Sequence, residues 1–244
     1  MRIPRIYLPL ELSPDQSVEL NEHAFQHTVK VLRMKKDAKL FLFDGKGNEY
    51  SASLEQINKK NASVIIHEKI NSKTESNLFI HLGLGISKGE RMDFAIQKAV
   101  ELGVTEITPL FTEHCVVNLD EKRIKKRLSH WQGIIISACE QSGRNILPVL
   151  NTTSTLIDWA ESINQLCLVL DPLAKKSLKE IKPKEDFINL VVGPEGGLSS
   201  KEVTELTKKN NFHAVKFGSR ILRTETAAIS SITALQLLWG DLLI

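Results

Sequence analysis

The residues best suited to chemistry lie in the stretch LVVGPEGGLSSKEV, residues 190–203, where a short apolar run ends in Gly-Pro-Glu-Gly-Gly. Glycines let a backbone approach a ligand closely or adopt a positive φ. The turn carries one carboxylate, Glu195, and Ser199 and Ser200 follow as candidate N-caps of a helix. The pattern predicts a ligand-binding turn at the carboxyl end of a strand, where α/β sheets bind their ligands.

This turn lacks the features of a phosphate-binding loop. It does not end in Gly-Lys-Ser/Thr, it comes late in the chain, and Glu195 would repel a phosphate group. An ordinary glycine-rich connection between a strand and a helix is the alternative, and this stretch by itself does not decide between the two.

A second stretch, FGSRILRTETAAIS at residues 217–230, also follows a short apolar run and opens a helix. It places Arg220, Arg223 and Glu225 close together. Arginines near a helix N-terminus oppose the helix dipole, which favours anions there, so an anionic partner would explain their position. The alternative is a solvated helix start capped by Thr224.

Both stretches lie in a part of the chain where strands and helices alternate. Strands are predicted for the apolar runs LFIHLGLGIS, VTEITPLFT, LCLVLD, FINLVVG and HAVKFG, and helices over 89–103, 122–143, 199–210 and 225–240. In the first helix, Phe94, Ile96 and Ala99 are among the candidates for the apolar face. This alternation predicts a parallel α/β sheet with helices on both faces.

The first 70 residues have a different pattern. AKLFLFDGKGNEYSASLEQI, residues 38–57, predicts a β-hairpin, and ASVIIHEKI predicts a further strand. One short helix is expected within LNEHAFQHTVKVLRM. The polar segment NSKTESN, residues 71–77, marks the expected domain boundary.

Composition narrows the class of protein. The 244 residues carry a formal net charge of +3, which permits a nucleic-acid partner without requiring one. The cysteines, Cys115, Cys139 and Cys167, are far apart and form no CxxC pair, so neither a disulfide framework nor a zinc site is expected. His23 and His27 lie one helical turn apart without an evident third ligand, so no metal is predicted. No apolar run reaches the roughly 18 residues of a membrane helix.

Taken together, the motifs resemble those of the RsmE-type 16S ribosomal RNA methyltransferases of the SPOUT superfamily. The resemblance runs nearly end to end. It rests on these segments, which follow the order of the family: HTVKVLRMKKDAKLFLFDGKGNEYSA, SKGERMDFAIQKAVELGV, PLFTEHCVV, RLSHWQGIIISACEQSGR, VVGPEGGLSSKE and FGSRILRTETA.

The resemblance implies an α/β fold with a C-terminal SPOUT methyltransferase domain over residues 73–244, containing a deep trefoil knot at about 165–230. It implies a small N-terminal PUA-like, RNA-binding β-barrel over residues 1–72. The implied activity is S-adenosylmethionine-dependent methylation of N3 of one uridine, uridine-1498, in 16S rRNA of the small ribosomal subunit. The implied enzyme is cytoplasmic and commonly a homodimer.

Matching the motifs residue by residue assigns candidate roles. Arginine stays charged and offers a planar fork of donors, so Arg220 or Arg223 would stabilise charge on the uracil or bind a phosphate. Glu195 or Glu225 would take the N3 proton or orient an arginine. The catalytic candidates are Arg220, Arg223 and Glu225. The cofactor-binding candidates are Leu170, Gly193, Pro194, Glu195, Gly196, Gly197, Leu198, Phe217, Gly218, Ile221 and Leu222. The RNA-binding candidates are Arg5, His27, Arg33, Lys88, Arg91 and Arg144.

The chain departs from the pattern of the family in the segment TEHCVV. His114 and Cys115 stand where the family usually has Arg-Ser. If that arginine contacts RNA, His114 would do so weakly or only when protonated. The consequence of this replacement is open at the level of sequence.

Three other functions compete with uracil methylation. Methylation of a ribose 2′-hydroxyl would use the same cofactor site with a different acceptor. A non-catalytic RNA-binding or ribosome-assembly factor would have lost cofactor binding, and the intact glycines and RILRTETA argue against it. A nucleotidase-like enzyme would need a cluster of metal-binding aspartates that the sequence does not contain.

Overall fold

The structure, a computed structural model, describes residues 3–115 and 120–243. Contacts divide the chain into an N-terminal unit, Met1–Glu75 with Ile136–Leu147, and a C-terminal unit, Ser76–Ile135 with Pro148–Ile244. The expected division into residues 1–72 and 73–244 did not anticipate that a later segment, 136–147, packs with the N-terminal unit. That segment contains the end of helix α3 (Glu121–Ser142) and the loop that follows it.

A five-stranded sheet with the order β1-β3-β4-β5-β2 forms the centre of the N-terminal unit. Its strands are β1 (Arg5–Tyr7), β2 (Ser17–Glu19), β3 (Lys39–Phe43), β4 (Glu49–Ile57) and β5 (Ala62–Ile70). β1 and β3 are parallel, and the other neighbours are antiparallel. The expected hairpin between β3 and β4 forms. Asp44 Oδ1 stabilises its turn by accepting hydrogen bonds from the amides of Lys46 at 2.7 Å and Asn48 at 3.1 Å.

The expected short helix of this unit has two parts. Helix α1 (Glu22–Phe25) begins at the N-cap Asn21, whose side chain accepts a hydrogen bond from the Ala24 amide at 2.9 Å. It continues into the π-helical segment η1 (Gln26–Val31). Ala24 and Phe25 join the apolar core that covers the sheet.

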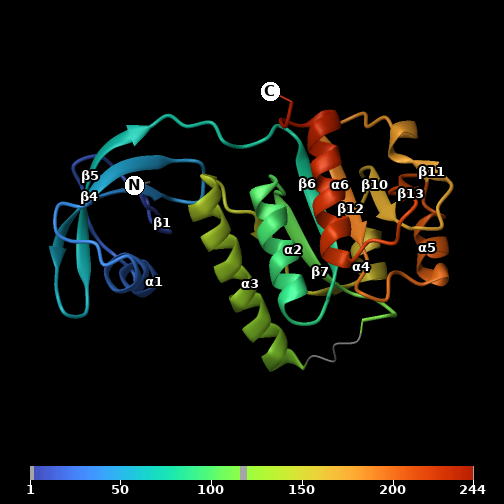
Figure 1. The fold of residues 1–244 in the computed structure, drawn as a ribbon, viewed down its shortest axis with the longest axis horizontal. Helices are drawn as coiled ribbons and strands as arrows, with labels where there is room; N and C mark the ends of the chain where they lie inside the picture. Colours follow the sequence, from blue (N-terminus) through green and yellow to red (C-terminus); the bar gives the residue numbers. More distant parts are fainter. Residues whose placement is uncertain (1–2, 116–119, 244) are drawn as a thin grey trace. The chain divides into compact units, whose positions relative to one another are not determined.

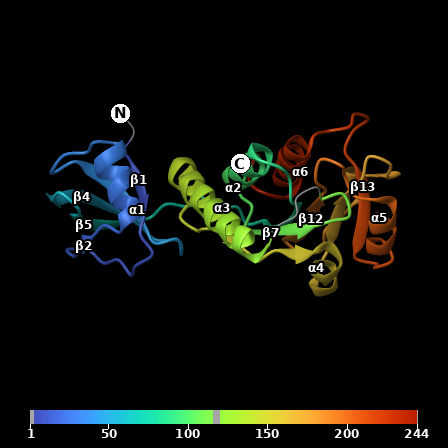
Figure 2. The same cartoon turned by 90° about the horizontal axis from the view of Figure 1, so that it is seen from below.

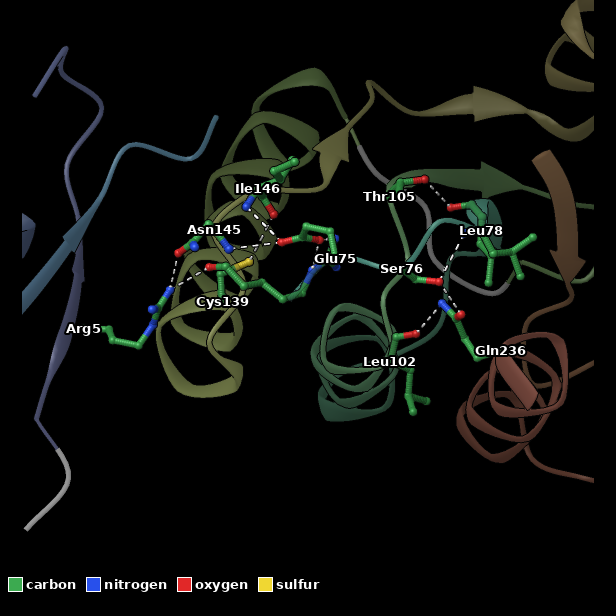
Figure 3. A network of polar contacts seen from close by, with 12 residues as sticks. Arg5, Glu75, Ser76, Leu78, Leu102, Thr105, Cys139, Asn145, Ile146 and Gln236 are labelled. Atoms are coloured by element: carbon green, nitrogen blue, oxygen red, sulfur yellow. Dashed lines mark hydrogen bonds and ion pairs between the residues drawn. The ribbon is translucent and has the colours of Figure 1, made fainter. Parts of the chain in front are cut away.

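A network of polar contacts holds residues 136–147 within the N-terminal unit (Figure 3). Arg5 forms an ion pair with Glu49, and its Nη2 donates to Asn145 Oδ1 at 2.7 Å. The Glu75 carboxylate accepts from the Asn145 amide at 3.1 Å and pairs with Arg144 Nη2 at 2.7 Å. Since the Arg144 side chain is only 4% exposed, these contacts are part of the interior of the unit.

The C-terminal unit is built on an eight-stranded sheet in which all the neighbouring strands are parallel. Its order is β11-β13-β10-β12-β6-β7-β8, and β9 also pairs with β7. The strands are β6 (Phe79–Gly85), β7 (Glu106–Phe111), β8 (Val149–Leu150), β9 (Ser154–Thr155), β10 (Cys167–Leu170), β11 (Lys176–Ser177), β12 (Phe187–Val192) and β13 (Phe212–Lys216). The predicted parallel α/β sheet is therefore confirmed.

Helices cover both faces of this sheet. Figures 1 and 2 show α2 (Glu90–Glu101) beside α6 (Thr224–Trp239) on one face, with α4 (Leu156–Ser162) on the other. Helix α5 (Ser200–Leu206) shares the apolar cluster of α4, since Leu206 packs in the same cluster as Trp159. A 3-10 turn, η2 (Leu178–Glu180), follows β11. Within the described residues, no helix is both long and apolar enough to span a membrane.

The strand order decides which loops meet. β10 lies between β12 and β13, with Val169 opposite Val191 on one side and opposite Ala214 on the other. Because the three strands are parallel, their carboxyl ends lie at the same edge of the sheet. The connections that begin after Leu170, Val192 and Lys216 therefore leave the sheet side by side.

Candidate functional site

A cavity of about 500 Å³ opens where these three connections meet. Its wall comes from residues 170–173 at the end of β10, 192–198 at the end of β12, and 217–218 and 220–222 after β13. Residues at the starts of α5 and α6 complete the wall. Two turns that are distant in sequence are therefore brought to one site by the order of the strands.

The Gly-Pro-Glu-Gly-Gly turn folds back on itself and packs on the end of β6. A Cβ atom on Gly193 would lie 2.8 Å from the carbonyl carbon of Gly197, which is closer than side chains approach. A Cβ on Gly85, the last residue of β6, would lie 2.5 Å from the nitrogen of Pro194. These close approaches explain why glycine is needed at both positions.

Glu195 turns its carboxylate toward residues 88–91 of the same unit. Its Oε1 accepts a hydrogen bond from the Lys88 amide at 2.9 Å and lies 3.3 Å from Arg91 Nη1. Partial burial opposes its ionisation, but these contacts and a hydrogen bond from Ser87 hold the pKa of Glu195 below its ordinary value. Glu195 is therefore an ionised partner of this loop, which favours an orienting role over that of a proton acceptor.

The second turn leads into helix α6. Gly218 has a φ of 75°, a conformation that glycine adopts without strain. Arg220 lines the cavity. Arg223 is the N-cap residue, but its side chain makes no capping hydrogen bond, so the expected alternative of a helix capped by Thr224 is not what forms.

Thr224 is the first residue of α6 and lines the cavity. It is 5% exposed, and its hydroxyl oxygen has no hydrogen-bond partner among the residues that the structure describes. Buried polar atoms in proteins almost always have a partner. Thr224 Oγ1, beside the cavity, is therefore a candidate contact for a bound ligand.

The lining combines apolar surface with a few charged groups. The apolar part includes Leu170, Val192, Leu198, Val215, Phe217 and Ile221. Asp171, Glu195 and Arg220 are the charged residues of the wall. Such a site suits a small molecule that combines apolar surface with a few polar groups.

Comparison with known proteins identifies the family. The family model of an RNA methyltransferase domain matches residues 74–236, and that of an RNA methyltransferase PUA domain matches residues 20–66. The ribosomal RNA small subunit methyltransferase E of Buchnera aphidicola subsp. Schizaphis graminum is 41% identical over 99% of this chain and 98% of its own length. The chain belongs to the ribosomal RNA small subunit methyltransferase E family. The member from Bacillus subtilis is 30% identical over 95% of each chain.

Solved structures of two relatives match this family member along its whole length. A methyltransferase from Legionella pneumophila in complex with the bound cofactor SAM is 42% identical, with a TM-score of 0.96 over 99% of this chain and 100% of its own. The ribosomal RNA small subunit methyltransferase E from Neisseria gonorrhoeae, bound to S-adenosyl methionine, is 40% identical, with a TM-score of 0.92 over the same shares. The N-terminal unit accordingly contains a PUA domain, matched over residues 20–66, as the resemblance implied.

The structure brings the cofactor-binding candidates of this family member together. Every one of them, from Leu170 through the first turn to Leu222, lines the same cavity, and so does the catalytic candidate Arg220. Arg223 and Glu225 are not among the lining residues; Arg223 is exposed, while Glu225 Oε2 is buried without a hydrogen-bond partner among the described residues. Lining a cavity is not binding, so these roles stay predictions.

The RNA-binding candidates differ in how accessible they are. Arg33, Lys88 and Arg91 are exposed, and His27 is half-buried. The side chains of Arg5 and Arg144 are only 8% and 4% exposed, and both are in ion pairs with glutamates. This geometry favours a structural role for Arg5 and Arg144 over direct contact with a phosphate.

Several residues that line the cavity were not predicted from the sequence as binding residues. Asp171 and Leu173 line the cavity, and so does the hydroxyl-bearing Thr224. The signal for Asp171 was present, because it is a carboxylate at the end of the apolar run LCLVLD. Gly85 gave no signal, because its need for glycine comes from a turn more than a hundred residues later. Among the described residues, no group of three or more His, Cys, Asp or Glu side chains could hold a metal ion.

Proposed function

We propose that the chain transfers a methyl group from S-adenosylmethionine to N3 of a specific uridine, uridine-1498, in 16S rRNA of the small ribosomal subunit. The main support is the cavity formed by the two glycine turns, which are those of the family motif. Two relatives that are 40% and 42% identical to this chain were crystallised with S-adenosylmethionine and share its fold over 99% of its length.

The residues of the cavity fit this cofactor. The apolar wall suits an adenine ring, backbone groups of the two turns offer donors and acceptors for its polar edge, and Thr224 Oγ1 needs a partner. Asp171 provides negative charge for a cationic ligand. The cofactor would supply an activated methyl group, and the chain would orient it toward the acceptor.

The site must also activate the acceptor, uracil N3. Uracil N3 is protonated near neutral pH, so its proton must leave and the negative charge that develops on the ring must be stabilised. Arg220 is exposed and lines the cavity, so its guanidinium is available for that charge. Glu225 stays the candidate for the proton acceptor, since Glu195 is occupied by Lys88 and Arg91. N3 is on the Watson–Crick edge, so the target base must be unpaired or flipped out.

RNA binding would use both units, each through its own exposed cations. Arg33 and His27 would serve the PUA domain, and Lys88 and Arg91 would serve the methyltransferase domain. Single-stranded RNA is held mainly through phosphate contacts and stacking, which these side chains suit. Because its substrate is ribosomal RNA, we place the enzyme in the cytoplasm.

A homodimer is part of the proposal. Leucines at the end of the chain are exposed, with Leu238 at 52% and Leu243 at 77% exposure. Exposed apolar residues that gather in this way are typical of an interface. Sedimentation at micromolar concentration should give twice the mass of one chain.

The knot at about 165–230 is also proposed. It is supported by the order of the strands, since β13, the last strand in the chain, lies between the earlier strands β10 and β11. Tracing the main chain in an experimental map tests it: the segment after β13 must pass through the loop that precedes it.

The activity is tested with small ribosomal subunits that lack the modification. We expect radiolabel from S-adenosylmethionine to enter 16S rRNA and nuclease digestion to yield 3-methyluridine by mass spectrometry. A 2′-O-methylated nucleoside would show that the acceptor is ribose instead. Calorimetry that detects no S-adenosylmethionine binding would leave only an RNA-binding factor.

A further inference from the structure

The segment after β7 contacts the Gly-Pro-Glu-Gly-Gly turn through His114. The ring nitrogen Nδ1 lies 3.0 Å from the carbonyl oxygen of Gly196 and 3.3 Å from that of Gly197. Carbonyl oxygens only accept hydrogen bonds, so Nδ1 must carry a proton and donate it. Both contacts lie within the C-terminal unit.

The two backbones also approach closely at this point. A Cβ atom built on Gly196 would lie 2.8 Å from the Cβ atom of His114. The glycine at position 196 is therefore required by the neighbouring segment. Any side chain larger than that of glycine at position 196 would clash with His114.

The residue before His114 is fixed by contacts of its own. The Glu113 amide donates to Glu202 Oε1 at 2.8 Å, and Glu113 Oε2 accepts from Ser199 Oγ at 2.6 Å. Ser199 and Glu202 form the capping box at the start of helix α5. Glu113 thus holds the segment after β7 against the start of α5, and this fixes the position of the neighbouring His114.

We propose that His114 is a positioning residue that fixes the peptide groups of Gly196 and Gly197 in the conformation that binds S-adenosylmethionine. This inference rests on the proposed function, because both glycines line the cavity assigned to that cofactor. Glycine backbones have the greatest conformational freedom, so an unbraced turn would lose that freedom on binding. A hydrogen bond formed beforehand lowers that cost and raises affinity.

His114 stands where the family usually has arginine, and in this chain it contacts the cofactor turn. A histidine that served RNA would direct its polar ring atoms to the substrate. Here Nδ1 is engaged by the cofactor turn. Loss of the side chain should therefore weaken cofactor binding.

Titration calorimetry of S-adenosylmethionine with the full chain tests the inference. We expect His114→Ala to weaken binding roughly three- to tenfold, the effect of one lost hydrogen bond. His114→Asn keeps an amide donor near the position of Nδ1 and should bind within about twofold of the wild type. His114→Gln places its amide farther along the side chain and should behave like alanine. His130→Ala, which removes a hydrogen bond to Asp93 on α2, is the matched control and should bind normally.

Kinetics provide a second readout. His114→Ala should raise KM for S-adenosylmethionine by the same factor and leave kcat at saturating cofactor unchanged. Equal cofactor affinity in wild type and His114→Ala, or a raised KM for RNA alone, would overturn the inference. If His114→Ala fails to fold, equal affinities of the asparagine and glutamine variants would also overturn it. If the wild type itself does not bind S-adenosylmethionine, the proposed function fails and this inference with it.

Discussion

At the scale of single residues, two polar side chains in the wall of the cavity differ in their hydrogen-bond partners. The Thr224 hydroxyl is buried without a hydrogen-bond partner among the described residues, whereas Glu195 Oε1 accepts from the Lys88 backbone amide and pairs with Arg91. The Thr224 hydroxyl is therefore a candidate to bind the ligand, whereas the contacts of Glu195 stabilise the wall of the cavity.

Thr224→Val should separate ligand binding from stability. Valine has the shape of threonine without the hydroxyl, and a buried hydroxyl with no partner does not stabilise the free protein. We expect an unchanged or slightly raised Tm, together with S-adenosylmethionine binding weakened roughly three- to tenfold. Calorimetry and thermal melting measure the two effects. A lower Tm with unchanged affinity would mean that the hydroxyl has a structural partner instead.

Arg220→Ala should slow methyl transfer more than it weakens cofactor binding. Removing a group that stabilises developing charge typically costs about 10²–10³ in kcat. We expect a loss of this size, with S-adenosylmethionine affinity within about threefold of the wild type. Arg123 is the control: its side chain is 71% exposed and pairs only with Asp120 among the residues described, so Arg123→Ala should leave turnover unchanged. Comparable losses in both variants would remove Arg220 from the catalytic group.

At the scale of elements, local sequence signals placed most helices and strands correctly. The expected helices correspond to α2, α3, α5 and α6, and the expected start of α5 at Ser199 is confirmed by its capping box. Helix α4 was missed because it is only seven residues long, although Thr155 and Asp158 mark its N-terminus. Phe94 was wrong as a buried residue: it is 46% exposed, and Lys98 Nζ lies 5.6 Å from the centre of its ring.

Glu140, near the end of α3, should make stability depend on pH. Its Oε1 accepts a hydrogen bond from the Tyr7 amide at 3.1 Å, Oε2 is buried without a partner among the described residues, and burial raises its pKa. A carboxyl with a raised pKa stabilises the fold below the unfolded pKa, about 4.3, and this contribution is lost as pH rises through the folded pKa. The Tm of Glu140→Gln relative to wild type should therefore increase from pH 4 to pH 8.

Glu55→Gln is the control of opposite sign. Hydrogen bonds from Ser17 and Ser63 lower the pKa of Glu55, so its contribution is present at neutral pH and is lost as pH falls through the lowered pKa. Relative to wild type, the Tm of Glu55→Gln should fall as pH rises. If both variants followed the same trend, a general charge effect would be the cause and the assignment to Glu140 would be wrong.

At the scale of the whole molecule, the arginines predicted to bind RNA divide into two groups. Arg144 is buried in an ion pair with Glu75, and breaking such a pair typically costs about 3–5 kcal/mol. We expect Arg144→Ala to lower the Tm markedly. Arg33→Ala should leave the Tm unchanged and weaken RNA binding, with the slope of log K against log salt reduced by about 1. Filter binding over a range of salt concentrations measures this, and a stable Arg144→Ala that loses RNA affinity would reverse the assignment.

The sequence by itself determined the local chemistry of this protein: two glycine turns at strand ends, arginines at a helix start, and the alternation that builds a parallel sheet. These features depend on neighbouring residues, whose backbone preferences act over a few positions. Tertiary structure alone decided that β10 lies between β12 and β13, which adds Asp171 to the cavity, and that residues 136–147 join the N-terminal unit. It also decided which charges are buried and that His114 meets Gly196. These contacts depend on packing between segments that are distant along the chain, so they cannot be predicted from local sequence patterns.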